Sequence, residues 1–93
     1  MANQQEIKIK INDEQLKGAY ANFMRVTHQR GEFVMDFAHI VPPAGIVTAR
    51  VMTTPAHLKQ IIKALVKNLA DYEKKFGKVE EAEDREEEIG FHD

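Results

Sequence analysis

The sequence predicts an α+β fold: a four-stranded antiparallel β-meander, followed by one long amphipathic α-helix packed on one face of the sheet. Up to residue 53, apolar and polar residues alternate in several runs, at the period of a half-buried strand. The period then changes to about 3.6 residues, which is that of an α-helix. The last residues are mostly acidic and are expected to form a disordered tail, because like charges in a row repel one another. A chain of 93 residues leaves room for one domain, which gives a flexible N-terminus at 1–5, the domain at 6–78 and the tail at 79–93.

Turn residues separate the expected strands. Arg30 and Gly31 supply a two-residue turn, because glycine accepts a positive φ. Pro42 and Pro43 end the next run, since neither proline can donate to a sheet ladder. The pairing of the first strand stays open, because it can join an edge of its own sheet or that of a neighbouring subunit. The four expected strands are residues 6–11, 20–29, 32–41 and 45–53.

The helix is expected at residues 55–76. Thr54 suits the N-cap, and Pro55 suits the first helical position, where its missing N–H costs nothing. Gly77 is the expected C-terminal cap. One apolar stripe follows steps of three or four residues and consists of Leu58, Ile61, Ile62, Leu65, Val66, Leu69, Tyr72 and Phe76.

The turn at Arg30 fixes which residues lie opposite one another. Arg25 is expected opposite Asp36, and a three-residue connection at 42–44 places Arg50 opposite Asp36 as well. A connection one residue longer would send Arg50 toward the helix, where its burial would be costly. The same register places Ile46 beside Ile40 on the Asp36 face. It sends Val47, Ala49 and Val51 to the face under the helix.

The face that carries Asp36 is expected to bind a second copy of the chain. One helix cannot cover both sides of a sheet, and a contiguous apolar patch in water is uncommon in monomers. We therefore expect a homo-oligomer, most simply a symmetric dimer. The apolar residues of this face are Ala21, Phe23, Val34, Ala38, Ile40, Ile46 and Met52. The expected interface consists of Phe23, Arg25, Val34, Asp36, Ile40 and Arg50.

No arrangement of residues points to catalysis, so we expect neither an enzyme, nor a cofactor, nor a metal. The chain has no cysteine and lacks the glycine-loop, GxSxG, HExxH and EF-hand patterns. Asp36 and His39 are three residues apart on a strand, so they point to opposite faces. His28, His39, His57 and His92 are too dispersed to form a metal site. An ion pair between strands is the simpler role for Asp36 and its arginines than an anion site.

The net charge of −2 hides two unlike segments. Residues 1–78 hold 12 basic against 7 acidic side chains, whereas residues 79–93 hold one basic against eight acidic ones. Lys59, Lys63 and Lys67 form a row along one helix flank and are a candidate basic surface. A nucleic-acid-associated regulator with an autoinhibitory acidic tail is therefore the alternative to a protein-binding module. No run of about 20 apolar residues and no secretory leader is visible, so a cytoplasmic location without membrane contact is expected.

Three strings, EFVMDF at 32–37, RVMTTPAH at 50–57 and YEKKFG at 72–77, occur in this order. Over about residues 6–78, the chain resembles a small, functionally uncharacterised prokaryotic domain-of-unknown-function family. Its members carry E-F-V-x-D-F, R-[IV]-x-x-T-P-x-H and Y-E-x-x-F-G. The resemblance implies a bacterial or archaeal origin and no established activity. The order of sheet and helix is also similar to the subunit plan of the SecB export chaperone. We expect a non-enzymatic, homo-oligomeric protein-binding or adaptor module, with a chaperone-like apolar surface as one form.

Overall fold

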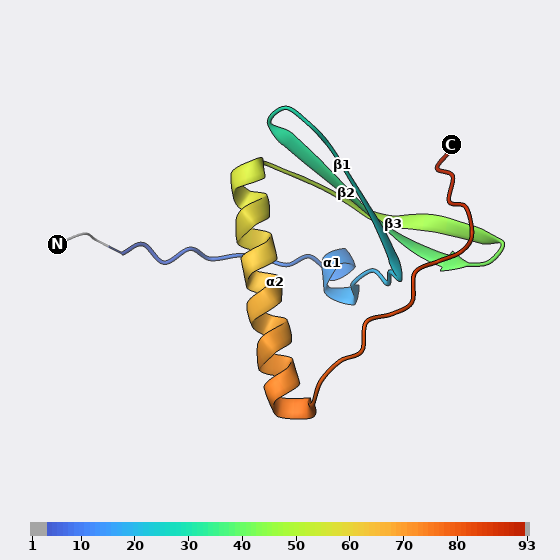
Figure 1. Ribbon diagram of the computed structural model, residues 1–93. Coiled ribbons are helices and arrows are strands. Elements are labelled where there is room, and N and C mark those ends of the chain that lie inside the picture. The colour runs from blue at the N-terminus through green and yellow to red at the C-terminus, as the bar shows by residue number, and fades with distance from the viewer. Residues whose placement is uncertain (1–3, 93) are drawn as a thin grey trace. The chain divides into compact units, whose positions relative to one another are not determined.

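The computed structural model describes residues 4–92 and has an α+β fold. Two compact units divide between Leu58 and Lys59, and each is described by itself. The first unit contains a short helix and an antiparallel sheet, and the second contains most of a long helix and the chain that follows it (Figure 1). The elements in chain order are α1 at Asp13–Lys17, β1 at Phe23–Gln29, β2 at Glu32–Val41, β3 at Ala44–Thr53 and α2 at Pro55–Phe76.

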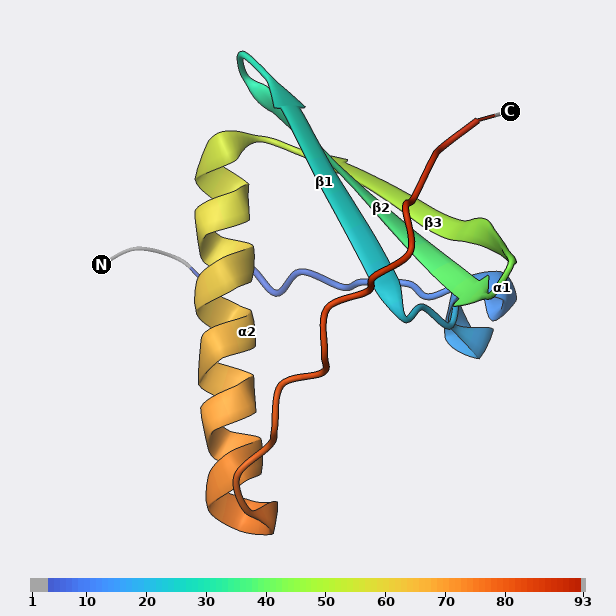
Figure 2. The same cartoon turned by 45° about the vertical axis from the view of Figure 1, so that its right-hand side comes forward.

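The sheet has the order β1-β2-β3, with both pairs antiparallel (Figure 2). Among the described residues it contains three strands, so the expectation of a fourth strand at residues 6–11 is wrong for the single chain. Those residues have the side-chain alternation of a strand, but within residues 4–92 their backbone has no hydrogen-bond partner, and a strand needs both.

The predicted register around the first turn is confirmed. Arg25 pairs with Asp36, Val26 with Met35 and Met24 with Phe37. Gly31 has a φ of 84°, a conformation that L-residues with a side chain rarely adopt, so the turn depends on this glycine.

The connection from β2 to β3 differs from the prediction. Val41 pairs with Ala44, so the link is the two residues Pro42 and Pro43, and β3 begins one residue earlier than expected. An irregularity between Phe37 and Ala38 restores the count, because Phe37 pairs with Ala49 while Ala38 pairs with Val47. Thr48 is therefore the extra residue of a β-bulge.

The bulge at Thr48 moves two side chains to the opposite faces from those expected. Ile46 lies opposite His39 on the Met35 face, and Val47 lies opposite Ala38 on the Asp36 face. Beyond the bulge the register agrees with the prediction, and Arg50 pairs with Asp36. The expectations for Ile46 and Val47 are thus wrong. The link is one residue shorter than predicted, and the extra residue Thr48 compensates for this shift in register only from Ala49 onward.

β1 begins at Phe23, three residues later than expected. Just before it, the Asn22 side chain replaces a strand pair: its Nδ2 donates to Ile40 O at 2.9 Å, and its Oδ1 accepts from Ile40 N at 2.8 Å. The Thr48 hydroxyl lies 3.0 Å from Tyr20 O and 3.2 Å from Phe37 O, to which it donates. Side chains therefore satisfy the backbone where the regular ladder of β1 ends.

The predicted bounds of α2 are confirmed at both ends. Thr54 caps the start, because its Oγ1 accepts a hydrogen bond of 3.2 Å from the backbone N–H of His57. At the other end Gly77 has a φ of 104° and donates its N–H to Glu73 O. The Glu73 carboxylate also accepts from the N–H of Val79 at 2.9 Å.

Few apolar side chains are buried. Met35 and Ala38, both on β2, are less than a tenth exposed, and α2 has no buried residue. After α2, residues 79–92 contain no helix and no strand. The disorder expected of the acidic tail stays a prediction, and Asp93 lies outside the described residues. Residues 1–3 of the N-terminus that we expect to be flexible lie outside them too.

Candidate interaction surface

Asp36 lies at the centre of the sheet and is bound by an arginine from each neighbouring strand. Its Oδ1 is 2.6 Å from Arg50 Nε, and its Oδ2 is 3.0 Å from Arg50 Nη2. Arg25 Nη2 donates to the same Oδ2 at 3.1 Å. The Asp36 side chain is only 1% exposed, whereas those of Arg25 and Arg50 are 37% and 59% exposed. The predicted meeting of these three residues is therefore confirmed.

The electrostatics of the triplet keep Asp36 ionised. The hydrogen bonds and charge of Arg50, together with those of Arg25, lower the pKa of Asp36 from 3.8 to about 2, against the opposing effect of burial. The pKa of Arg50 is raised, chiefly by its hydrogen bonds to Asp36. Both carboxylate oxygens accept hydrogen bonds from arginines, and the carboxylate carries no proton near neutral pH. This geometry suits a link between strands and not proton transfer.

The residues predicted for the interface lie on one face of the sheet. Phe23 and Val34 share this face with the ion-paired triplet, and Ile40 lies on it near the Pro42–Pro43 link. All three are half-buried. The most exposed apolar side chains here are Val47 at 43% and Met52 at 56%. Sequence reasoning assigns Val47 to the wrong face, because a bulge leaves no mark in the alternation of residues.

The opposite face, which we call the Met35 face, has no Asp, Glu, Lys or Arg on its three strands. Its central residue, Met35, is 7% exposed, but its neighbours Met24, Val26 and Val51 are 45%, 48% and 44% exposed. Ile46 is 69% exposed near the end of this face. Both faces of the sheet therefore present apolar side chains to solvent.

The apolar stripe of α2 is also exposed. Leu58 and Ile61 are half-buried. The other members, which are Ile62, Leu65, Val66, Leu69, Tyr72 and Phe76, are 51–65% exposed. Tyr72 and Phe76 contact each other, with ring centroids 4.9 Å apart. The prediction that the helix packs on one face of the sheet stays a prediction.

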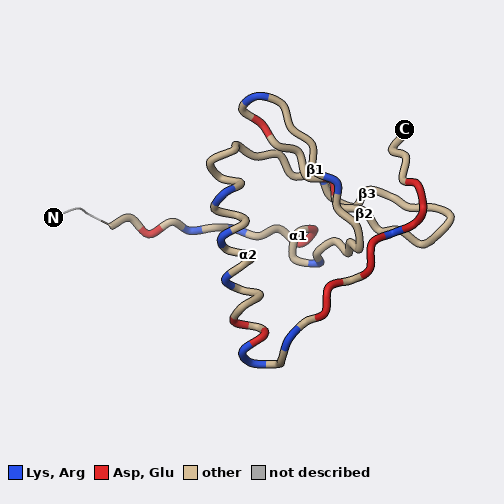
Figure 3. Tube along the Cα trace, viewed as in Figure 1, with Lys and Arg blue, Asp and Glu red and all other residues tan. Residues whose placement is uncertain are grey.

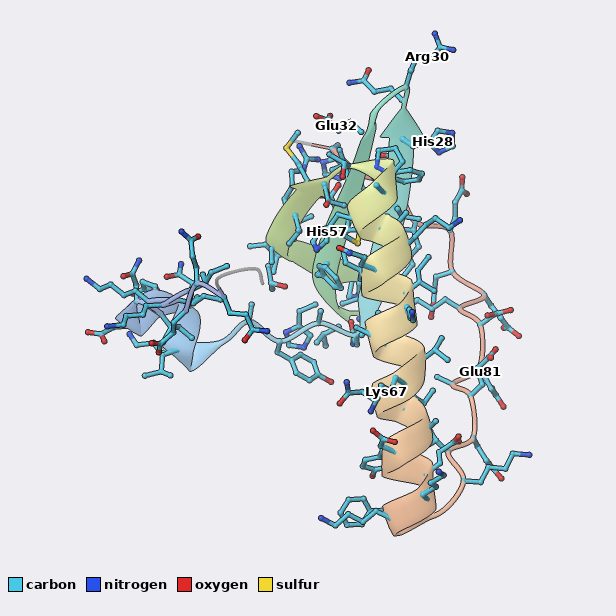
Figure 4. All side chains as sticks on the ribbon, turned by 90° about the vertical axis from the view of Figure 1, so that its left-hand side faces the viewer. His28, Arg30, Glu32, His57, Lys67 and Glu81 are labelled. Carbon is cyan, nitrogen blue, oxygen red and sulfur yellow. The ribbon has the colours of Figure 1, made fainter. Side chains whose placement is uncertain are left out.

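The predicted basic surface lies on α2, where Lys59, Lys63 and Lys67 are all exposed. Figure 4 shows Lys67 on the middle turns of the helix. Its Nζ is 3.0 Å from Asp71 Oδ2, so one of the three cations is ion-paired within the helix. Figure 3 shows that basic residues predominate along α2, whereas the chain after Lys78 is mainly acidic.

Three of the histidines, His28, His39 and His57, contact neighbouring side chains. His57 Nδ1 lies 2.7 Å from Thr53 Oγ1, at the first turn of α2 (Figure 4). The His39 ring packs edge-on against Tyr20 at 4.8 Å, and His28 contacts Phe33. Within residues 4–92, no three His, Cys, Asp or Glu side chains are grouped so that they could hold a metal ion. No helix in this part of the chain is both long and apolar enough to span a membrane.

A family model described as "Protein of unknown function (DUF3467)" matches residues 1–81. The chain belongs to this family. The predicted membership of a domain-of-unknown-function family is thus confirmed, and the DUF3467 match is longer at both ends than the resemblance over residues 6–78. It includes Asp36, both its arginines and all of α2, and it ends within the acidic segment. Comparison with curated proteins found no match, and comparison with solved structures found none.

Proposed function

We propose that this protein is a non-enzymatic, homo-oligomeric protein-binding or adaptor module of the cytoplasm. The observation that carries the proposal is the exposure of apolar side chains on both faces of the sheet. Val47 and Met52 are exposed beside the triplet, and Met24, Val26 and Val51 are exposed on the Met35 face. Apolar surface of this kind is typical of protein interfaces, because its removal from water favours association.

The Asp36 face is the proposed contact between copies. It combines apolar side chains with Arg25 and Arg50, and arginine is enriched in protein interfaces. Asp36 forms ion pairs with both arginines, which lowers the net charge that this contact would bury. The interface we propose retains Phe23, Arg25, Val34, Asp36, Ile40 and Arg50, and now includes Val47 and Met52.

Two further surfaces are apolar, the Met35 face of the sheet and the stripe of α2. The uncharged composition of the face and the amphipathic pattern of the helix support the packing of α2 against a sheet, as the sequence predicts. This packing leaves the Asp36 face for a second copy, and a chaperone-like apolar surface is one form that the assembly can take. The SecB-like order of elements is an analogy only.

The test is the mass of the protein in solution, measured by light scattering on a sizing column. We expect the parental chain to be an oligomer and Met52→Glu to have a lower mass, because the new charge would be buried in the interface. Gln60→Glu is the matched control, since it adds the same charge on the polar side of α2. A parental monomer would contradict self-association. An oligomer that Met52→Glu leaves intact would contradict this interface.

A nucleic-acid-associated regulator is the second candidate. The exposed row of Lys59, Lys63 and Lys67 on α2, beside an acidic tail that can compete with phosphate, favours it. Removal of residues 79–93 is then expected to strengthen salt-sensitive binding of DNA or RNA. The chain has no tryptophan and two tyrosines, so bound nucleic acid would clearly raise its absorbance at 260 nm. If the shortened form does not bind at low salt, this candidate fails.

A further inference from the structure

The segment at residues 6–11, which we call the arm, has the pattern of a strand without the pairing of one. Its isoleucines Ile7, Ile9 and Ile11 alternate with charged residues and are 80%, 88% and 58% exposed. Figure 1 shows the arm as an extended trace before α1. Among the described residues, no backbone hydrogen bond involves residues 6–11. Within residues 4–92, the backbone donors and acceptors of the arm are therefore unpaired, and its three β-branched side chains are exposed.

The sheet has a place for such a segment. Among the described strands, its order leaves the outer edges of β1 and β3 without a neighbouring strand. An open edge is a template for another strand unless lysines, prolines or inward-pointing charges block it. β3 contains no lysine and no proline, and its one charged residue, Arg50, is bound to Asp36. Beyond the bulge at Thr48, residues 49–53 form a regular run of five residues that matches the six-residue arm in length.

We propose that the arm of one copy pairs as a strand with the open edge of β3 in a second copy. The arm of the second copy pairs in the same way with β3 of the first. This proposal rests on the proposed function, because it specifies how the homo-oligomer forms. Each chain holds one donor segment and one acceptor edge, so a reciprocal exchange satisfies both and closes a twofold-symmetric dimer. The arm supplies the fourth strand that the sequence predicts, and a second chain supplies the partner that it lacks.

The composition of the two sheet faces determines on which face each side chain of the arm lies. Ile7, Ile9 and Ile11 continue the uncharged Met35 face, where Ile46 and Val51 of β3 are exposed. Glu6, Lys8 and Lys10 then lie on the Asp36 face, where the other charged residues of the sheet already lie. If the arm were turned over, Glu6, Lys8 and Lys10 would lie on the Met35 face, whose strands carry no charge. The three isoleucines would then lie on the Asp36 face and would lose their contact with the apolar side chains of the Met35 face.

The first test compares two substitutions one residue apart. Ile9→Ser removes an apolar side chain that packs on the Met35 face in the exchanged strand. Lys8→Ser changes a charged side chain on the other side of the same arm and leaves the three isoleucines in place. We expect Ile9→Ser to lower the mass in solution at least twofold and Lys8→Ser to leave it unchanged. An oligomer that persists in Ile9→Ser would overturn the arm exchange and leave self-association standing. A monomeric parental chain would overturn both proposals.

The second test locates the arm directly and does not require a loss of assembly. The chain has no cysteine, so single cysteines can be placed freely. Lys8→Cys in one copy is mixed with Met52→Cys in a second copy of different mass and treated with a short bismaleimide. Lys8 and Met52 then lie on the same face of the joined sheet, so a cross-link between copies is expected. Thr27→Cys, on the same face of β1, is the matched control.

The outcomes of the cross-linking decide the assignment, and the absence of any cross-link between copies would overturn the exchange. A cross-link from Lys8→Cys to Met52→Cys and none to Thr27→Cys supports the exchange at β3. A cross-link to Thr27→Cys alone would overturn the assignment to the β3 edge. When both cysteines are placed in one chain, a cross-link confined to that chain would show that the arm returns to its own sheet, and this would overturn the exchange.

Discussion

Arg50 binds Asp36 through two nitrogens, with Nε 2.6 Å from Oδ1 and Nη2 3.0 Å from Oδ2. This fork joins β3 to β2, and the bond from Arg25 Nη2 to Oδ2 joins β1 to β2. A single buried carboxylate therefore links all three strands. Because both oxygens accept hydrogen bonds, the triplet stabilises the register that the turn at Arg30 and Gly31 sets.

The fork between Arg50 and Asp36 predicts that lysine cannot replace Arg50. An ammonium group is a point charge and cannot match both carboxylate oxygens as a planar guanidinium does. We expect Arg50→Lys to lower the urea midpoint of unfolding, and Arg50→Met to lower it further. Arg30→Lys at the tip of the β1–β2 hairpin (Figure 4) is the control and should have no effect. Equal midpoints for Arg50→Lys and Arg30→Lys would show that the fork contributes nothing.

The lowered pKa of Asp36 predicts an acid-sensitive contribution to stability. The pKa is 3.8 in the absence of its partners and about 2 in the folded chain, so between these values the unfolded state binds more protons. The contribution is therefore fully present above about pH 4 and is lost progressively as the pH falls toward 2. Urea midpoints of the parental chain and of Asp36→Asn, measured from pH 5 to pH 2, should converge as the pH falls. A constant difference between them would contradict the assignment.

The β-bulge predicts a role for the hydroxyl of Thr48. It donates to the carbonyls of Tyr20 and Phe37, and valine has nearly the same shape without the donor. Thr48→Val should cost about 1 kcal/mol in the free energy of unfolding, as expected for one hydrogen bond. Thr27→Val is the matched control, because no hydrogen bond of the Thr27 side chain is found in the described structure. If both variants lose the same stability, the Thr48 bonds are not responsible.

The sequence was sufficient to predict the parts of the fold that depend on local signals. Thr54, Pro55 and Gly77 determine the ends of α2, and Arg30 and Gly31 determine the register of β1 on β2. The meeting of Arg25, Asp36 and Arg50 follows from that register and from the cost of burying Arg50 on the other face. These predictions succeed because each rests on a residue with a strong preference for one conformation or environment.

The failures concern features that alternation does not encode. The bulge at Thr48 exchanges the faces of Ile46 and Val47, although each residue by itself suits either face. Residues 6–11 have the period of a strand, but a period supplies no partner, and pairing is a property of two segments. For the candidate surface, the sequence identified the charged centre of the face. The sequence did not predict that Val47 lies on this face, because that position depends on the bulge at Thr48.

The side chain of Asn22 holds the start of β1 on β2, which leads to a further prediction. Its amide makes two hydrogen bonds with the backbone of Ile40, one through Nδ2 and one through Oδ1. Asn22→Ala removes both and should cost roughly 1–2 kcal/mol in the free energy of unfolding. Asn22→Asp keeps the acceptor for Ile40 N but places an oxygen against Ile40 O, so its free energy of unfolding should also be below that of the parental chain.

The control for Asn22 is Asn12→Ala, because Asn12 precedes α1 without making a capping bond through its side chain. Denaturant unfolding gives the free energies, and hydrogen exchange of the Ile40 amide reports the local effect, since this N–H donates to Asn22 Oδ1. We expect the amide to exchange faster in Asn22→Ala and to stay protected in Asn22→Asp. If Ile40 remains equally protected in all three variants, the asparagine does not hold this end of the sheet.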